Sequence, residues 1–266
     1  MKKVLYTCIT GEYDDVCAHT YIDDGWDYVL FTDNKYLLGM GQYMHWRVRP
    51  LFFYKLGNVK NARWHKINAH ILFPEYDYSL WVDGNIVIQS QDFFRRINSL
   101  IEMGTIISVP IHPTRKCIYD EAQAIKELRI DNKNTVNLEM RRLRLSRYPK
   151  NNGLNETCII LRQHNAPQII RAQNQWWNMV RKYSKRDQLS YNWAMWRNNI
   201  HTTPMYETAG AHRHCDELLF VHKVSHNQNP AENFDAWIVP RWLGRVLCIF
   251  ILHTKDKEKF IKKHCT

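Results

Sequence analysis

Residues 78–86, with the sequence YSLWVDGNI, decide the fold class because an apolar strand ends there in a polar Asp-Gly-Asn triplet. Residues 4–9 and 28–31 have the same character, since each is a buried strand that stops at a polar loop. Near-continuous apolar runs of this kind are typical of parallel strands that helices cover on both faces. We therefore predict an α/β sandwich with a mostly parallel central sheet.

Helical patterns alternate with these strands along the chain. They predict helices at residues 53–72, 92–103, 118–128 and 167–183, with further strands at residues 105–109 and 156–161. In open α/β sheets, ligands bind beyond the carboxyl ends of the strands. The loops that follow the strands, near residues 10–14, 33, 83–85 and 162, are therefore candidate parts of a binding site.

The chain is long enough for one large α/β domain, with 266 residues and no internal repeat or Pro/Gly-rich linker. We predict a single domain over residues 1–266.

The seven cysteines of the chain are odd in number and form no C-x-x-C pair, so neither a disulfide framework nor a zinc site is expected. The N-terminus lacks the apolar core of a signal peptide, and no stretch reaches the ~20 apolar residues that span a bilayer. Residues 246–252 are predicted as a short buried strand, and the expected location is cytoplasmic.

The formal net charge of +11 points to polyanionic partners, namely nucleic acid, an anionic membrane or phosphorylated ligands. Residues 141–147 and 255–263 are strongly basic, and each is predicted as a solvated face. The second of them is also a candidate for peripheral contact with a membrane surface. No motif for specific nucleic-acid recognition is visible. Aromatic residues make up 13% of the chain, and their rings suit sugar stacking, although most are predicted to be core.

Asp83 and Asn85 form the most informative pair of polar residues. Because they are two positions apart, their side chains project to one side in extended chain, and Gly84 lets a ligand approach closely. Two oxygen ligands suit Mg²⁺ or Mn²⁺, which would bridge the pyrophosphate of a nucleotide sugar. The alternative is an Asp-Gly-Asn turn between two strands.

Cations and further carboxylates supply the other candidates. Arg63 and Lys66 are three apart on a predicted helix, where they would clamp phosphates or merely lie on a solvated face. Glu156 is expected to bind sugar hydroxyls or to lie at a strand edge. Asp187 is a candidate general base, or a carboxylate favoured at a helix start. His212 is a candidate metal ligand from a His-x-His pair.

Together these segments resemble the glycosyltransferase-like domain of the plant turgor-regulation and mucilage-related proteins. The matching pieces occur in family order from about residue 4 to about residue 214. They are ARWHK at 62–66, LFPEYDYSLWVDGNI at 72–86, HP at 112–113, IYDEA at 118–122, ETCIILRQHN at 156–165 and RDQLS at 186–190. The joint match is far more specific than any single piece.

The resemblance implies a GT-A-like fold, a Rossmann-type α/β/α sandwich whose nucleotide-binding half covers about residues 1–110. It also implies an acceptor-binding half over about residues 111–225, followed by a basic extension at 226–266. Asp83-Gly84-Asn85 then stands where glycosyltransferases of this fold carry Asp-x-Asp. The chain departs from that pattern at Asn85, which weakens the expected metal site.

By the same analogy, Thr10, Gly11, Tyr13 and Asp33 face the base and ribose of the donor. The analogy also places Asp187 in the acceptor region and makes His212 a third metal ligand.

The predicted function is transfer of a hexose or related sugar from a nucleoside-diphosphate donor to a glycan or lipid-linked acceptor, as in polysaccharide biosynthesis. If the enzyme inverts, Asp187 is the expected base. If it retains, Glu156 or Asp187 holds the sugar instead. Two other classes stay open, a metal-dependent hydrolase that uses the same pocket and a non-catalytic protein that binds glycan or nucleic acid.

Overall fold

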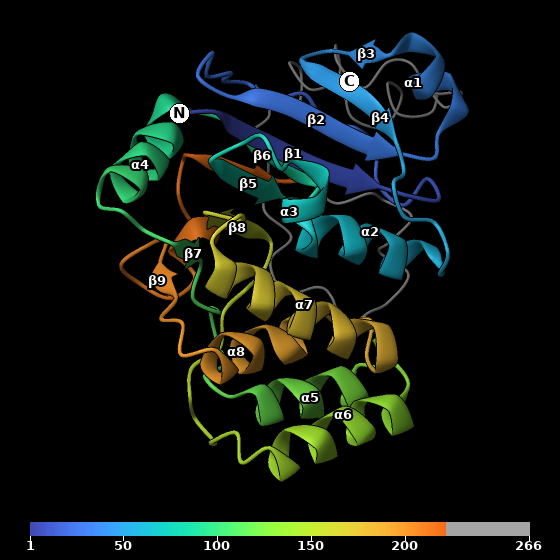
Figure 1. Cartoon of the computed structure of the whole chain (residues 1–266), viewed down its shortest axis with the longest axis vertical. Helices are drawn as coiled ribbons and strands as arrows, with labels where there is room; N and C mark the ends of the chain where they lie inside the picture. The colour runs from blue at the N-terminus through green and yellow to red at the C-terminus, as the bar shows by residue number, and fades with distance from the viewer. Residues whose placement is uncertain (222–266) are drawn as a thin grey trace, which may run out of the picture. The chain divides into compact units, whose positions relative to one another are not determined.

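A mixed sheet of eight strands forms the centre of the domain in the computed structural model (Figure 1). The structure describes residues 1–221, which belong to the unit Met1–His222. The predicted strand at 246–252, the basic tail at 255–263 and the extension at 226–266 lie outside the described residues. The single domain over residues 1–266, with its nucleotide-binding and acceptor-binding halves, stays a prediction.

The strand order of the large sheet is β3-β4-β2-β1-β5-β8-β7-β9. These strands are β1 (Lys3–Ile9), β2 (Asp27–Thr32), β3 (Gln42–Tyr43), β4 (Trp46–Pro50), β5 (Tyr78–Val82), β7 (Ile107–Val109), β8 (Ile159–Arg162) and β9 (Thr203–Pro204). The pairings give β4, β2, β1, β5, β7 and β9 one common direction, while β3 and β8 run against it. The mostly parallel α/β sheet is therefore confirmed.

A second, two-stranded sheet joins β6 (Ile86–Ile88) to β10 (Leu218–Phe220) in antiparallel pairing. Beyond the ladder, Gln89 N donates to Glu217 O at 2.8 Å and Val221 N donates to Asn85 O at 2.7 Å. These bonds hold the end of the described chain beside the Asp-Gly-Asn triplet. The 3₁₀ turn η1 (Ala211–Arg213), which precedes β10, is placed by the same pairing.

Eight α-helices accompany the sheets in residues 1–221: α1 (Lys35–Met40), α2 (Asn58–Ile67), α3 (Ala69–Leu72), α4 (Gln91–Glu102), α5 (Ile118–Glu127), α6 (Lys133–Leu145), α7 (Pro167–Lys182) and α8 (Gln188–Arg197). The single helix predicted at 53–72 is shorter and interrupted. Asn68 leaves helical geometry with φ −97° and ψ 46°, and its side chain donates to Trp64 O at 2.9 Å. No helix among these residues is long and apolar enough to cross a bilayer.

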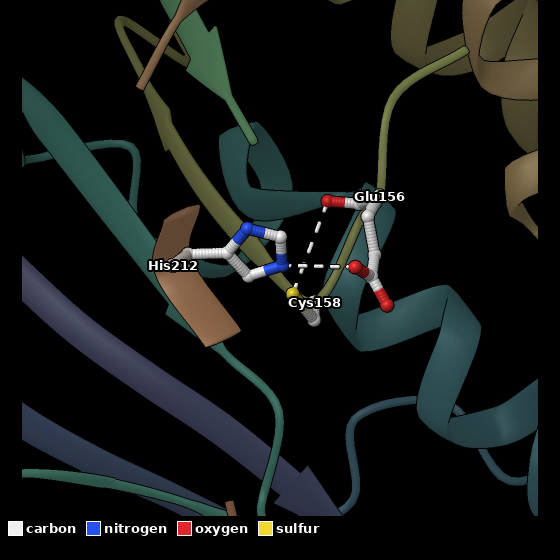
Figure 2. A group of neighbouring side chains, drawn as sticks. All are labelled: Glu156, Cys158 and His212. Atoms are coloured by element: carbon white, nitrogen blue, oxygen red, sulfur yellow. Dashed lines mark hydrogen bonds and ion pairs between the residues drawn. The ribbon is translucent and has the colours of Figure 1, made fainter. Parts of the chain in front are cut away.

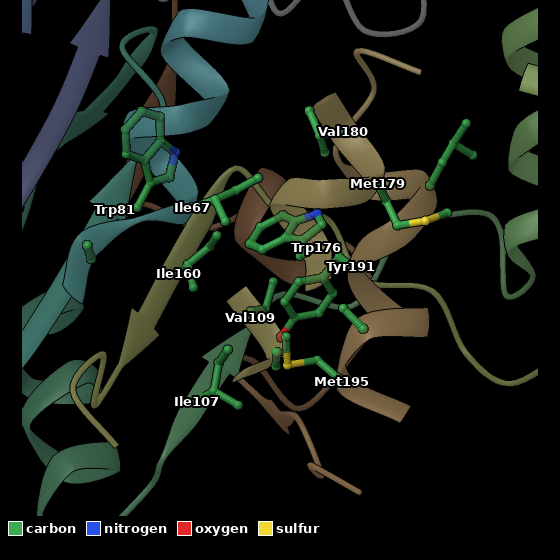
Figure 3. Packing of buried hydrophobic residues seen from close by; sticks show 14 of the residues in the cluster. Ile67, Trp81, Ile107, Val109, Ile160, Trp176, Met179, Val180, Tyr191 and Met195 are labelled. Carbon is green, nitrogen blue, oxygen red and sulfur yellow. The ribbon is translucent and has the colours of Figure 1, made fainter. Parts of the chain in front are cut away.

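Alternate residues of the central strands pack on opposite faces of the sheet. Tyr6 and Trp81 belong to the apolar cluster that includes α2, α7 and α8, whereas Leu5 and Leu80 belong to the cluster of α4. Figure 3 shows Trp81 and other strand residues packed toward α7 and α8. Coverage on both faces explains why these strands are apolar without alternation. Helices α5 and α6 pack on each other beyond α8 (Figure 1).

The basic run at 141–147 lies mainly on the solvated side of α6, as predicted. Arg141, Arg142 and Arg144 are exposed, while Leu143 between them is fully buried.

Replacing Ile97 tests the packing of α4 on the sheet. Ile97→Ala is expected to lower the free energy of unfolding by about 2–5 kcal/mol, because Ile97 is fully buried and its removal leaves a cavity. Leu145→Ala is the control, since Leu145 is 71% exposed, and it should change stability by less than about 0.5 kcal/mol. Urea unfolding of both variants measures this, and equal losses would contradict the assignment of α4 to the core.

Candidate active site

The polar loops predicted as site candidates meet at one edge of the sheet. Thr10 follows β1, Asp33 follows β2 and Asp83 follows β5, and these three strands are adjacent and parallel. Because the carboxyl ends of parallel strands lie at the same edge, the three loops are brought together by topology alone.

Lys66, in the last turn of α2, joins the candidate residues of this edge. Its Nζ lies 3.2 Å from Asp83 Oδ1 and 2.9 Å from Asp187 Oδ2, and it donates to Thr157 Oγ1 at 3.4 Å. Arg63 Nε lies 2.9 Å from Asp187 Oδ1. The Lys66 side chain is only 1% exposed and that of Arg63 is 20% exposed, so the alternative of a solvated helix face is wrong.

The carboxylate of Asp187 is held ionised by its neighbours. Burial by itself raises the pKa of this group, but the charges of Arg63 and Lys66 and hydrogen bonds from Lys66 and Thr157 outweigh it and hold the pKa well below its usual range. Thr157 Oγ1 donates to Asp187 Oδ2 at 2.8 Å. Asp187 is therefore a poor proton acceptor in this arrangement.

Asp83 is the most accessible member of this ion-pair cluster, with a side chain 27% exposed. Its Oδ1 accepts from Trp81 Nε1 at 2.6 Å and from Lys66 Nζ at 3.2 Å. Ile86 N donates to Asp83 O, so the triplet is a turn between β5 and β6, while its role in binding a metal stays a prediction. Asn85 is partly exposed in the same turn, so both predicted metal ligands are open to solvent.

Gly84 presses the triplet against the first strand. A Cβ at Gly84 would lie 2.8 Å from Ile9 Cγ1 and 2.9 Å from Ile9 Cδ1. Since real Cβ atoms essentially never come that close, only glycine fits here without a shift of Ile9. The contact fixes the Asp-Gly-Asn turn on the end of β1.

Residues 10–13 and Asp33 form a second part of the edge. Gly11 N donates to both carboxylate oxygens of Asp33 at 3.0 Å, and Thr10 Oγ1 donates to Asn58 O at 3.0 Å. Gly11 has a φ of 61°, a left-handed conformation that favours glycine. Tyr13 is 60% exposed. The structure thus brings together the predicted base- and ribose-facing residues and ties them to the start of α2.

Glu156 and His212, from distant parts of the sequence, form a separate cluster (Figure 2). His212 Nε2 lies 2.8 Å from Glu156 Oε2, and Arg213 also pairs with this carboxylate, with its Nε 3.0 Å from Oε2. Burial raises the pKa of Glu156, but hydrogen bonds from His212 and Arg213 and the charge of Arg213 lower it to about 2. The structure therefore places His212 on Glu156, a pairing that the sequence did not predict.

Glu156, Cys158 and His212 offer ligand atoms that lie within 4.8 Å of one another, which is close enough to hold a cation. A cation there would compete with Arg213 for the carboxylate and would require the buried Cys158 thiol, whose pKa burial raises well above its usual value, to lose its proton. The mixed N, O and S donor set therefore fits Mg²⁺ or Mn²⁺ less well than the open oxygens of Asp83 and Asn85 do.

Two polar residues that the sequence did not single out face a small hollow beside Asp83. Thr7 and His19 line it together with Asp83 and Gly84, and both are buried. Thr7 Oγ1 and His19 Nε2 have no hydrogen-bond partner among the described residues. Burial lowers the pKa of His19 to about 3, so its ring is neutral. Nothing in the local sequence distinguishes these two residues, because their significance depends on tertiary packing.

A model of the TOD1/MUCI70 glycosyltransferase-like domain matches residues 9–226, a range that contains every candidate site residue that the sequence predicts. The chain belongs to the TOD1/MUCI70 glycosyltransferase-like family. A probable hexosyltransferase, MUCI70 of Arabidopsis thaliana, is 25% identical to it over 188 residues, which are 67% of this chain and 32% of the relative. This chain thus spans about a third of that relative's length.

One solved glycosyltransferase shares the fold of this TOD1/MUCI70 domain. The apo structure of the bifunctional glycosyltransferase WbbM aligns with a TM-score of 0.50 at 9% identity, over all of this chain and 52% of that one. Apo mouse xyloside xylosyltransferase 1 aligns with a TM-score of 0.41 at 9% identity, over 76% of this chain and 84% of that one. The predicted GT-A-like fold class is confirmed.

Removing the charge of Asp187 tests the ion-pair cluster. Asp187→Asn is expected to lower the free energy of unfolding at pH 7 by about 3–5 kcal/mol, because Arg63 and Lys66 lose a buried partner. Folding lowers the pKa of Asp187 below its ordinary 3.8, so this stabilisation is present above pH 3.8 and declines as the pH falls below it.

Denaturant unfolding at pH 7, 4 and 2.5 measures the difference between Asp187→Asn and the unmodified chain. The matched control is Asp92→Asn, whose pair with Arg95 is exposed and should change stability little. A loss in Asp187→Asn that stayed constant down to pH 2.5 would show that the charge is not its cause.

Proposed function

We propose that this domain is a glycosyltransferase that moves a hexose or related sugar from a nucleoside-diphosphate donor to a glycan or lipid-linked acceptor. The observation that carries the proposal is the buried cluster of Arg63 and Lys66 with Asp83 and Asp187 at the carboxyl edge of the sheet. Membership of the TOD1/MUCI70 family and the GT-A-like fold support it.

Arg63 and Lys66 are the proposed partners of the donor diphosphate. Arg63 matches a phosphate with a planar fork of donors, and Lys66 supplies a compact charge. Asp83 and Asp187 pair with both cations, so the ion pairs hold Arg63 and Lys66 in position and leave neither charge buried without a partner. An arriving phosphate would exchange with carboxylate oxygens around the same ammonium.

The nucleoside is proposed to lie over residues 10–13, where Asp33 offers a carboxylate for ribose hydroxyls and Tyr13 an exposed ring. Thr7 and His19 add unpartnered polar atoms in the small hollow beside Asp83.

Asp83 and Asn85 are the proposed ligands of Mg²⁺ or Mn²⁺. The fit rests on their oxygen chemistry and on the partial exposure of both residues. Such a cation would neutralise charge on the leaving diphosphate. Because Asn85 is neutral and Lys66 already lies 3.2 Å from Asp83, we expect weak metal binding that strengthens with a nucleotide present.

The cationic partners of Asp187 and Glu156 bear on the roles that these two carboxylates can take. A protein base needs a carboxylate with appreciable proton affinity, but the pKa values of both Asp187 and Glu156 are lowered by their cationic partners. These two carboxylates are better suited to orienting hydroxyls and the cations of the site than to removing a proton.

Donor binding is tested by a thermal-shift screen of nucleoside diphosphates and nucleotide sugars, with and without Mn²⁺. Occupancy at ~100 times the dissociation constant stabilises the folded state by roughly 2.7 kcal/mol, so a matching nucleotide is readily seen. The shift should shrink strongly in Asp83→Ala, while Asp92→Ala on the exposed face of α4 should behave as the unmodified chain. A well-folded protein that responds to no nucleotide would refute the transferase proposal.

Products distinguish transfer from hydrolysis once the donor is known. Free sugar without a glycosylated acceptor would assign the pocket to a hydrolase instead.

Gly11→Ala tests the nucleoside loop. A Cβ at Gly11 would lie 1.9 Å from Asn58 Nδ2, and its φ of 61° strains any other residue, so the loop must move. We expect nucleotide affinity to fall at least about tenfold, equivalent to 1.4 kcal/mol. Gly39→Ala is the control, because a Cβ there meets no atom within 4 Å. Calorimetric titration of the nucleotide found in the screen gives both affinities, and equal values would remove this loop from the site.

A further inference from the structure

A second cavity of about 410 Å³ lies beyond the ion-pair cluster. We call it the Asn-rich groove, and it lies between the loop at 152–155 and the C-terminal end of α8 with the segment that follows. The described residues that line it are Asn152, Gly153, Asn155, Asn192, Met195, Trp196, Asn199, Ile200, His201 and Thr202. Its volume is in the range of about 300–1,000 Å³ that small-molecule sites occupy.

The lining of the groove is polar without formal charge. Although charged residues make up 24% of the chain, the described lining contains no Asp, Glu, Lys or Arg. Each Asn side chain both donates and accepts hydrogen bonds, as sugar hydroxyls do. Trp196 adds a partly exposed indole, an apolar surface of the kind on which the apolar face of a pyranose packs. This combination suits a neutral, hydroxyl-rich ligand and offers little to a phosphate.

The walls of the groove are fixed before any ligand binds. Asn192 Nδ2 donates to Asn155 Oδ1 at 2.7 Å, and Asn155 N donates back to Asn192 Oδ1 at 3.1 Å. Tyr148 meets Trp196 edge to face, with ring centroids 5.4 Å apart and an interplanar angle of 88°. Fixed polar groups and a fixed ring lower the cost of ordering the site when a ligand binds.

The groove adjoins the candidate active site through the backbone. Asn155 immediately precedes Glu156, and consecutive Cα atoms are about 3.8 Å apart. Pro110 O accepts from both residues, from Asn155 Nδ2 at 3.2 Å and from Glu156 N at 2.9 Å. A ligand in the groove therefore lies next to residues 156–158, the turn that leads into β8.

We propose that the Asn-rich groove binds neutral sugar residues of the acceptor glycan. That this ligand is the acceptor of the reaction rests on the proposed function. Binding of a neutral saccharide depends on the groove alone. The donor is excluded from this position by its charge, since its phosphates find no cation in the described lining. Selectivity follows from the same chemistry, because uronic-acid or phosphorylated glycans would bring a charge that the groove does not pair.

A glycan array tests the proposal with defined probes. The probes are immobilised neutral oligosaccharides, matched oligosaccharides that contain uronic acids, and sugar phosphates, and the fluorescently labelled full chain is the ligand. We expect retention on a subset of the neutral probes. Asn152→Asp and Asn199→Asp should each weaken this binding about tenfold, because each replaces amide donors by a carboxylate at an exposed position of the groove.

Matched controls separate the groove from the rest of the surface. Asn178→Asp adds the same charge on the exposed side of α7 and should leave binding unchanged. His201→Ala, also at an exposed position of the lining, removes a ring without adding a carboxylate and should weaken binding as well. Thermal unfolding of each variant identifies any that fail to fold.

The outcomes distinguish the groove from the proposed donor site. Neutral binding that Asn152→Asp, Asn199→Asp and His201→Ala leave intact would overturn the groove assignment, as would retention on charged probes alone. A chain that binds a nucleotide through Asp83 but no neutral glycan also overturns the groove and leaves the transferase proposal standing. Groove-dependent glycan binding without any nucleotide response would confirm the groove and remove the donor site.

Discussion

The ammonium group of Lys66 is the point on which the site depends. It reaches Asp83 at the end of β5, Asp187 at the start of α8 and Thr157 ahead of β8. A lysine charge that is only 1% exposed destabilises the fold unless anionic or polar partners surround it. The contacts of Lys66 therefore hold these three segments in fixed positions relative to one another. Arg162 and Tyr6 stabilise the backbone of Lys66, since both side chains donate hydrogen bonds to Lys66 O.

The positions in the candidate site that the sequence predicted are those fixed by strand topology. Apolar runs identified β1, β2 and β5, and parallel pairing then placed Thr10, Asp33 and Asp83 at one edge. Lys66 was harder to place, because α2 has a mostly polar sequence whose pattern does not indicate which side is buried. Its environment depends on α8, which lies more than a hundred residues later.

Other features depended on contacts that local sequence does not encode. The pairing of His212 with Glu156 follows from the position of η1, which the pairing of β10 with β6 determines. The Asn-rich groove arises in the same way, from an amide pair between Asn155 and Asn192 that joins a loop to a helix. Neither residue type nor spacing predicts such pairs, since asparagines are common in loops and at helix ends for local reasons.

The bond from Val221 N to Asn85 O has a consequence for the order of folding. The bond joins two residues that are far apart in the sequence. The Asp-Gly-Asn triplet therefore gains this backbone hydrogen bond only after the segment that contains Val221 has been synthesised and has packed beside it. Contacts of such large sequence separation form slowly, because a long loop must close before they gain any stabilisation. During synthesis on the ribosome, β1, β2 and β5 can pair early, but Asp83 and Asn85 reach their final geometry among the last parts of the domain.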